Sequence, residues 1–265
     1  MILRRCGFLF FAFCAIVSLW FAGCGDDAPE TTDAASPSSD AIAKSVDPLK
    51  YKDWVSYSFK NIRIIYPPDH RFAENIPGMA AGYDFGVRAD CNFLGIAVPT
   101  DTLTIYFYDH YAKAHTMTGH VFPFVYSDTI HFWYPNFYGV SLLDCLLPRW
   151  NSTEPTHRFL REGLRALLDY SGNNYHEITH MFLHDPEFAD TGFVPLAEIA
   201  VDTTVDVYAE RHQSSLSASF VDFVIYTYGM DKFKQFYDAT DPFNRAVERT
   251  FDISVDSIET VWLHF

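Results

Sequence analysis

The pattern of apolar residues changes at about Glu154, and this change limits the folds that the chain can adopt. Before it, short apolar or alternating runs are typical of strands, and one longer segment, residues 77–93, can form a helix. After it, nearly every segment has helical spacing. We therefore expect an α+β fold: a mixed sheet with one long helix, followed by a helical lobe. The expected strands are 61–66 and 103–108, with a hairpin of 120–125 and 129–134; the expected helices after Glu154 are 157–170, 176–184, 195–211, 215–228, 231–238, 244–251 and 254–264.

Residues 176–180 read His-Glu-Ile-Thr-His, a spacing with a specific chemical consequence. On a helix, positions i and i+4 lie one above the other, so His176 and His180 can bind one metal ion while Glu177 lies beside a bound water. This is the ligand geometry of zinc hydrolases, although an amphipathic helix with two unrelated histidines has the same letters. Asn173 or Asn174 can cap such a helix. His184 continues the series but lies too far along one straight helix to share the ion.

A catalytic zinc site takes three protein ligands and leaves a fourth position open. Pro195 suits the first turn of a further helix, which we expect to carry Glu198 as the third ligand and to run to about Arg211. Asp202 lies four residues after Glu198 on the same helical face. It can accept the free ring N–H of a ligating histidine, as carboxylates around metal sites do, or it can be an ordinary surface acid.

The first residues of the chain predict where in the cell the protein is located. Arg4 and Arg5 precede an apolar run over residues 7–22, which is the order of a signal peptide. The segment from Phe21 to Cys24 resembles a bacterial lipobox, with Phe21 where leucine is usual. We expect residues 1–23 to be removed and Cys24 to be lipidated; an uncleaved membrane anchor is the alternative. Residues 24–47 are predicted to be a disordered tether, and residues 48–265 one domain held outside the cytoplasm at a bacterial membrane.

Charge and cysteine content restrict the partners further. Loss of Arg4 and Arg5 with the signal peptide lowers the formal charge from −15 to −17, which disfavours nucleic acids and anionic lipid surfaces as partners. Cys91 and Cys145 are the remaining cysteines after Cys24. They can form a disulfide in an oxidising compartment, but their distance in sequence leaves the pairing open.

Taken together, these residues resemble the peptidase MA-like families of the gluzincin metallopeptidases. Those families carry H-E-x-x-H, then a segment like P-x-W-L-x-E-G-L-A, then S-F-V-x-Y-L-x-x-x-Y-G, and end in an apolar helix with a tryptophan. The matching pieces here are residues 176–180, 193–200, 219–229 and 258–262. The resemblance covers roughly residues 55–265, and the first half matches only in layout. It implies a zincin-like fold. Ile199 departs from the usual glycine, and Val194-Pro195 from an aromatic residue.

Carried over residue by residue, the resemblance implies that His176, His180 and Glu198 bind Zn²⁺ and that Glu177 is the general base. Asp202 would be the acid behind the ligands, as in thermolysin-like enzymes. Zinc lowers the pKa of its bound water and polarises a carbonyl, while Glu177 would take the water proton and pass it to the leaving amine. Other divalent ions also suit such ligands. Tyr208, His212, Tyr226 and Tyr228 are candidates to stabilise the oxyanion, although aromatic residues at this spacing are more often core.

Two further groups of residues have simpler explanations. Residues 159–166 also resemble the E-G-L-A element, but they precede the histidines, so Glu162 is interpreted as part of an amphipathic helix. His110, His115, His120 and His131 are dense enough for a second metal site, but their spacing fits no ligand pattern on one element. We interpret them as isolated surface histidines.

Two functional classes remain open from the sequence. The first is a membrane-tethered zinc metallopeptidase that hydrolyses extracytoplasmic peptides or proteins, with the peptide bound along an edge strand, expected near residues 129–133. The second is a non-catalytic lipoprotein that uses a peptidase-like fold to bind a partner or an envelope component. The presence of Glu177 beside an intact histidine pair favours the enzyme.

Overall fold

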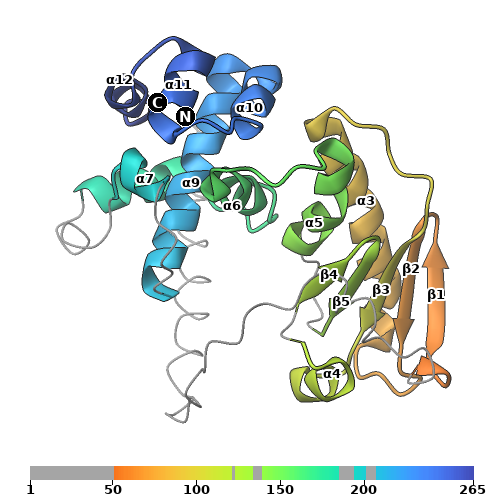
Figure 1. Cartoon of the computed structure of the whole chain (residues 1–265). Coiled ribbons are helices and arrows are strands. Elements are labelled where there is room, and N and C mark those ends of the chain that lie inside the picture. The colour runs from red at the N-terminus through yellow and green to blue at the C-terminus, as the bar shows by residue number, and fades with distance from the viewer. Residues whose placement is uncertain (1–50, 121–122, 134–138, 185–193, 201–206) are drawn as a thin grey trace, which may run out of the picture. The chain divides into compact units, whose positions relative to one another are not determined.

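The computed structural model describes residues 51–120, 123–133, 139–184, 194–200 and 207–265 (Figure 1). The signal peptide, the lipidation site Cys24, the tether and the acid Asp202 all lie outside these ranges and stay predictions. Among the described residues, no helix has both the length and the apolar character needed to cross a membrane.

The first half of the domain contains a five-stranded mixed sheet in the order β1-β2-β3-β5-β4. Strands β2, β3 and β5 run parallel, and the edge strands β1 and β4 run antiparallel to their neighbours. The α+β class and the mixed sheet are therefore confirmed. The strands are β1 (Val55–Phe59), β2 (Ile62–Tyr66), β3 (Leu103–Phe107), β4 (Phe124–Tyr126) and β5 (Thr129–Phe132).

The predicted hairpin forms, but its strands occupy different places from those expected. Strands β4 and β5 pair through Tyr126 and Thr129, with Ser127 at a positive φ of 51° in the turn between them. Strand β5 lies between β3 and β4 and is not an edge strand. The expectation that a peptide adds to residues 129–133 is therefore wrong, because both backbone edges of β5 are already paired. On this side of the sheet the edge strand is β4.

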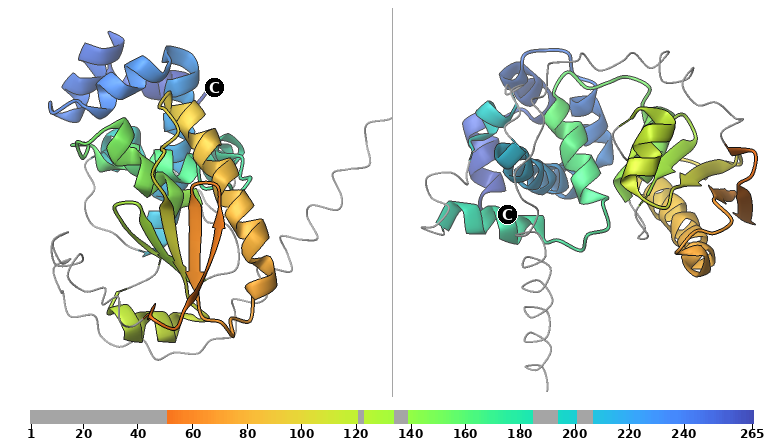
Figure 2. Two further views of the ribbon diagram at one scale, coloured as in Figure 1. Left: turned by 90° about the vertical axis from the view of Figure 1, so that its right-hand side faces the viewer. Right: turned by 90° about the horizontal axis from the view of Figure 1, so that it is seen from below.

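Two helices cover one face of the sheet. Helix α3 (Ile76–Leu94) packs on β1 and β2, helix α5 (Gly139–Trp150) packs on β4 and β5, and the two helices contact each other (Figure 2). Helix α3 was expected from the sequence, whereas α5 was not. The other short helices of this half are the 3-10 turn η2 (Ala73–Asn75) and α4 (Tyr111–Thr118).

The second half is helical, as the sequence predicts. Its longest helix, α9, forms one continuous element over a region where two helices were expected. Helix α8 is a single turn that ends at Ile199, so the expectation that the Glu198 helix continues to about Arg211 is wrong. The helices are α6 (Arg158–Leu167), α7 (Tyr175–His184), α8 (Leu196–Ile199), α9 (Val207–Tyr228), α10 (Met230–Tyr237), α11 (Phe243–Phe251) and α12 (Val255–Trp262).

A buried acid connects α3 to the segment that precedes α7. Asp90 is 0% exposed, and its Oδ1 accepts a 2.5 Å hydrogen bond from the Tyr170 hydroxyl. Burial raises the pKa of Asp90 to about 6, although the Tyr170 hydrogen bond opposes this shift. The folded state therefore favours the neutral carboxyl. Its contribution to stability is fully present below the unfolded pKa of about 4 and is lost as the pH rises through 6.

We expect Asp90→Asn to remove this pH dependence. Between pH 4 and pH 7, the free energy of unfolding of wild type should fall by about 2 kcal/mol more than that of the variant. The reason is that an amide does not ionise. Urea unfolding at pH 4, 5, 6 and 7 measures the difference. The exposed Asp69→Asn variant is the control. Parallel curves for wild type and Asp90→Asn would contradict the assignment.

Candidate functional site

Helix α7 includes the whole His-Glu-Ile-Thr-His segment. The Asn174 side chain caps it, since its Oδ1 accepts the Glu177 backbone N–H at 3.2 Å. This satisfies one of the free amides of the first turn, as the sequence predicts. Helix α7 packs on α9 through its buried residues Tyr175, Thr179 and Phe182. Glu177 and His180 are exposed, and His176 is half-buried.

His176 is held on both sides by residues of α9. Its Nε2 lies 2.7 Å from Asp222 Oδ2, and its Nδ1 lies 2.8 Å from Ser219 Oγ. Ser219 in turn accepts a 3.0 Å hydrogen bond from the indole N–H of Trp262. A hydrogen-bonded chain therefore joins α12, α9 and α7, and it fixes the plane of the imidazole.

The hydrogen-bond roles in this chain follow from the chemistry of its ends. An ionised carboxylate only accepts, so Asp222 requires a proton on His176 Nε2. In a neutral ring Nδ1 then accepts the Ser219 hydroxyl proton, while the indole donates to the same oxygen. A metal on Nε2 would have to displace both that proton and the Asp222 contact.

The predicted metal ligands do not meet among the described residues. The His180 ring stacks on His184 with centroids 6.0 Å apart. Glu198 is exposed on α8, which contacts α12 and is fixed there by a hydrogen bond from Leu196 N to Glu259 Oε2. No three metal-ligating side chains of the described ranges gather at one point. As placed, these residues do not fit a zinc ion, because His176 is occupied and Glu198 is not brought to it.

An aromatic hollow lies beside His176. The Phe265 ring meets the His176 ring edge-on at 4.7 Å and contacts Phe223 and Tyr226, each with ring centroids at 5.3 Å. Tyr226 is 78% exposed, although sequence reasoning favours a core position for aromatic residues at helical spacing. Val261 and Phe265 are also exposed. Of the other proposed oxyanion donors, Tyr228 packs on Phe223 and Phe251, and Tyr208 and His212 have no described side chains.

A network of partly buried ion pairs connects α5 to α6. Arg165 Nη2 lies 3.0 Å from Asp144 Oδ2, and Arg165 Nη1 lies 2.9 Å from Glu162 Oε2. Arg161 also pairs with Asp144, at 3.4 Å, and with Glu154. Burial raises the pKa of Asp144, and the two arginines oppose the rise. Glu162 lies on an amphipathic helix, as predicted, but sequence reasoning missed its connection to Asp144.

The four clustered histidines have separate structural roles. His110 caps α4 by accepting from Lys113 N, and His115 Nδ1 hydrogen bonds to the His120 carbonyl. His131 is buried, so its assignment to the surface is wrong. Its ring stacks on Tyr106 and its Nδ1 lies 2.9 Å from the Tyr108 hydroxyl. Burial lowers the pKa of His131 to about 3, so this ring is neutral.

Cys91 and Cys145 are both free and buried. The question left open by the sequence is therefore answered: these two thiols do not form a disulfide in this structure.

Neither a protein-family model nor a curated protein nor a solved structure matches the chain. The resemblance to the gluzincin peptidases therefore depends on the residues described above.

The Ser219 hydroxyl should contribute measurably to stability, because it is buried and joins Trp262 to His176. We expect Ser219→Ala to lower the free energy of unfolding by about 1 to 3 kcal/mol, since the indole N–H loses its acceptor. Urea unfolding measures the loss, with the exposed Ser58→Ala as the matched control. Equal losses in the two variants would show that the chain is not structural.

Proposed function

We propose that the protein is a membrane-tethered, extracytoplasmic lipoprotein that keeps a peptidase-like layout for binding, without catalysis. Its partner would be a protein or another component of the cell envelope. The observation that carries this proposal is the ion-pair network of α5 and α6, in which Arg165 joins Asp144 to Glu162.

The order of motifs in the resembling families supports this proposal. There, the H-E-x-x-H helix comes before the W-L-x-E-G-L element. Residues 159–164, Phe-Leu-Arg-Glu-Gly-Leu, match that element more closely than residues 194–200 do, because they retain the aromatic residue and the glycine. With this alignment, the preceding helix is α5.

Helix α5 packs on the sheet. In this proposal it corresponds to the metal helix of the resembling families. It carries Leu143-Asp144-Cys145-Leu146-Leu147 in place of H-E-x-x-H, with an acid at the glutamate position and leucines at the histidine positions. Leucine cannot bind a metal. The guanidinium of Arg165 then pairs with both acids and offsets part of their charge through hydrogen bonds that suit its planar geometry.

The surface of the helical half supports a binding role. Tyr226, Val261 and Phe265 form an exposed apolar patch with Phe223 over α9 and the end of α12. Contiguous exposed apolar residues of this kind commonly mark interaction sites.

Metal content of the purified full-length chain tests the proposal. Elemental analysis of wild type and of the His176→Ala/His180→Ala variant should give well below one equivalent of zinc in both, with no difference between them. One zinc per chain in wild type that is lost in the variant would overturn the proposal. A zinc content that is equal and stoichiometric in both would locate a metal elsewhere and would also contradict it.

A second candidate is the zinc-dependent metallopeptidase, favoured by α7 itself. His176 and His180 lie one turn apart on a formed helix, Glu177 is exposed beside them, and Ser219 orients the His176 ring. His176, His180 and Glu198 would hold the ion, which would supply Lewis-acid chemistry. This requires Asp222 to leave Nε2 and Glu198 to approach it.

Glu177→Gln separates the two candidates. If the enzyme assignment is right, this variant should keep its zinc and its fold but lose peptide hydrolysis by a factor of about 100 or more. A peptide library followed by mass spectrometry detects the cleavage, and the exposed Glu74→Gln variant is the matched control. Undetectable cleavage by wild type itself would reject this second candidate.

A further inference from the structure

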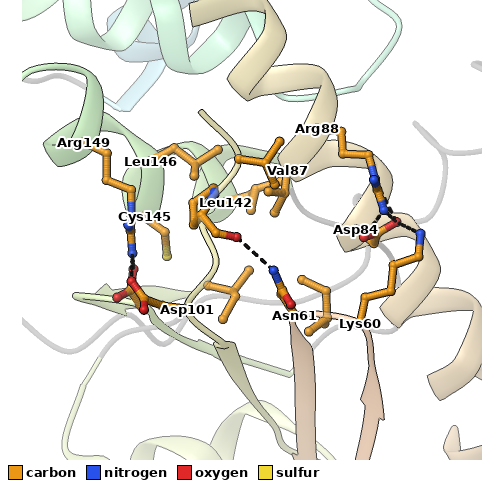
Figure 3. Close-up of a pocket in the computed structure, with 15 residues that line it drawn as sticks. Lys60, Asn61, Asp84, Val87, Arg88, Asp101, Leu142, Cys145, Leu146 and Arg149 are labelled. Atoms are coloured by element: carbon orange, nitrogen blue, oxygen red, sulfur yellow. Dashed lines mark hydrogen bonds and ion pairs between the residues drawn. The ribbon is translucent and has the colours of Figure 1, made fainter. Parts of the chain in front are cut away.

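A separate cavity lies at the start of the parallel strands, where α3 and α5 cover the sheet (Figure 3). Its lining comes from these two helices, from the first residues of β2 and β3, and from the loop around Val98. Its volume is about 230 Å³. None of the described residues of α7, α8 or α9 lines it, so it is independent of the candidate site and of the exposed apolar patch discussed above.

The interior of this cavity is apolar. Five buried aliphatic side chains line it, and the buried Cys145 thiol lies among them. Burial raises the pKa of Cys145, so the thiol is neutral and adds no charge to the lining. Such a lining offers water few hydrogen bonds, whereas an apolar ligand would gain contacts with it. The five side chains are Ile62, Val87, Leu103, Leu142 and Leu146.

The charged residues that line the cavity are already paired with one another. Three cations meet three carboxylates, so the rim carries no net charge. Figure 3 shows Val87, Leu142 and Leu146 between the ion pairs of Asp84 and those of Arg149. The pairs are Lys60–Asp84 at 2.6 Å, Arg88–Asp84 at 2.7 Å, Arg149–Asp128 at 2.8 Å and Arg149–Asp101 at 3.4 Å.

This pairing restricts the charge of a ligand. A charged ligand would have to break one of the ion pairs or leave its own charge without a partner in the apolar interior, and both cost free energy. The Asn61 amide is also engaged, because its Nδ2 donates to the Pro99 carbonyl at 2.9 Å. A neutral apolar ligand needs none of these groups, so the rim favours it over any ion of the same shape.

The volume restricts the size of the ligand. A cavity of about 150 Å³ lined by aliphatic and aromatic side chains is enough for benzene, which has six non-hydrogen atoms. On the same scale, this cavity has room for about nine.

We propose that this cavity binds a neutral apolar compound of about nine non-hydrogen atoms, of the size of an alkylbenzene. The ligand lies among the five aliphatic side chains and leaves the ion pairs of the rim intact. This role goes beyond the function proposed above and does not depend on it, since the two involve different residues.

Calorimetric titration of the full-length chain with propylbenzene tests the class of ligand. We expect one saturable site per chain with a Kd below about 1 mM. Two compounds of nearly the same shape isolate the effect of charge: 2-phenylethylammonium is a cation and phenylacetate is an anion. Each should bind at least about tenfold more weakly than propylbenzene, because neither finds an unpaired partner.

Two variants test the location. Leu142→Phe adds bulk inside the cavity, and Val98→Trp introduces an indole from an exposed position of the lining. Each should abolish the binding of propylbenzene. Val55→Trp, at a similarly exposed valine outside the cavity, is the matched control and should bind as wild type does. Thermal unfolding checks that each variant is folded; Val98→Trp decides alone if Leu142→Phe does not fold, because Val98 is at the surface.

Three results would overturn the proposal: no saturable binding of propylbenzene, binding of either ion as tight as that of propylbenzene, or binding that persists in the folded cavity variants. The zinc content that tests the proposed function bears on none of them. The two proposals can therefore fail separately.

Discussion

The close crossing of α6 and α9 at Gly163 is the contact on which the candidate sites of the helical half depend. A Cβ at Gly163 would lie 2.8 Å from Val221 Cγ2 and closer still to the Ser217 carbonyl, so only glycine permits this approach. The same stretch of α9 supplies Ser219 and Asp222 to His176. On α6, close to Gly163, Arg165 pairs with Glu162 and with Asp144 of α5. A small increase in the distance between α6 and α9 would therefore affect both groups of polar contacts.

Local features of the sequence were predicted well, because their causes lie within a few residues. Asn174 caps α7 through the amide of Glu177, three residues on. The β4–β5 hairpin follows from apolar residues on both sides of a two-residue turn. The long helix α3 was expected over residues 77–93 and forms over Ile76–Leu94, where it ends before Gly95, which has a positive φ of 68°.

The candidate site was harder to predict, because its contacts join distant residues. His176 and Asp222 are 46 positions apart, and helical spacing around His176 shows only which residues share its own helix. The pentapeptide predicts two ligands on one face, but whether a third donor reaches them depends on how other helices pack. Helix α5 was missed for a similar reason. Its apolar residues bury against both β5 and α3, which removes the polar face that an isolated amphipathic helix would show.

The physical difference between the two groups of polar residues explains why we favour binding over catalysis. A guanidinium such as that of Arg165 carries one fixed charge and planar donors, so it can bridge two carboxylates and hold two helices together. It offers no open coordination position to a substrate, so Asp144 and Glu162 serve packing. Both ring nitrogens of His176 are likewise already hydrogen-bonded, one to Asp222 and the other to Ser219. In each group the donors and acceptors are directed at one another. Recognition is therefore better placed on the exposed aromatic surface of Tyr226, Val261 and Phe265 than at either group of internally paired residues.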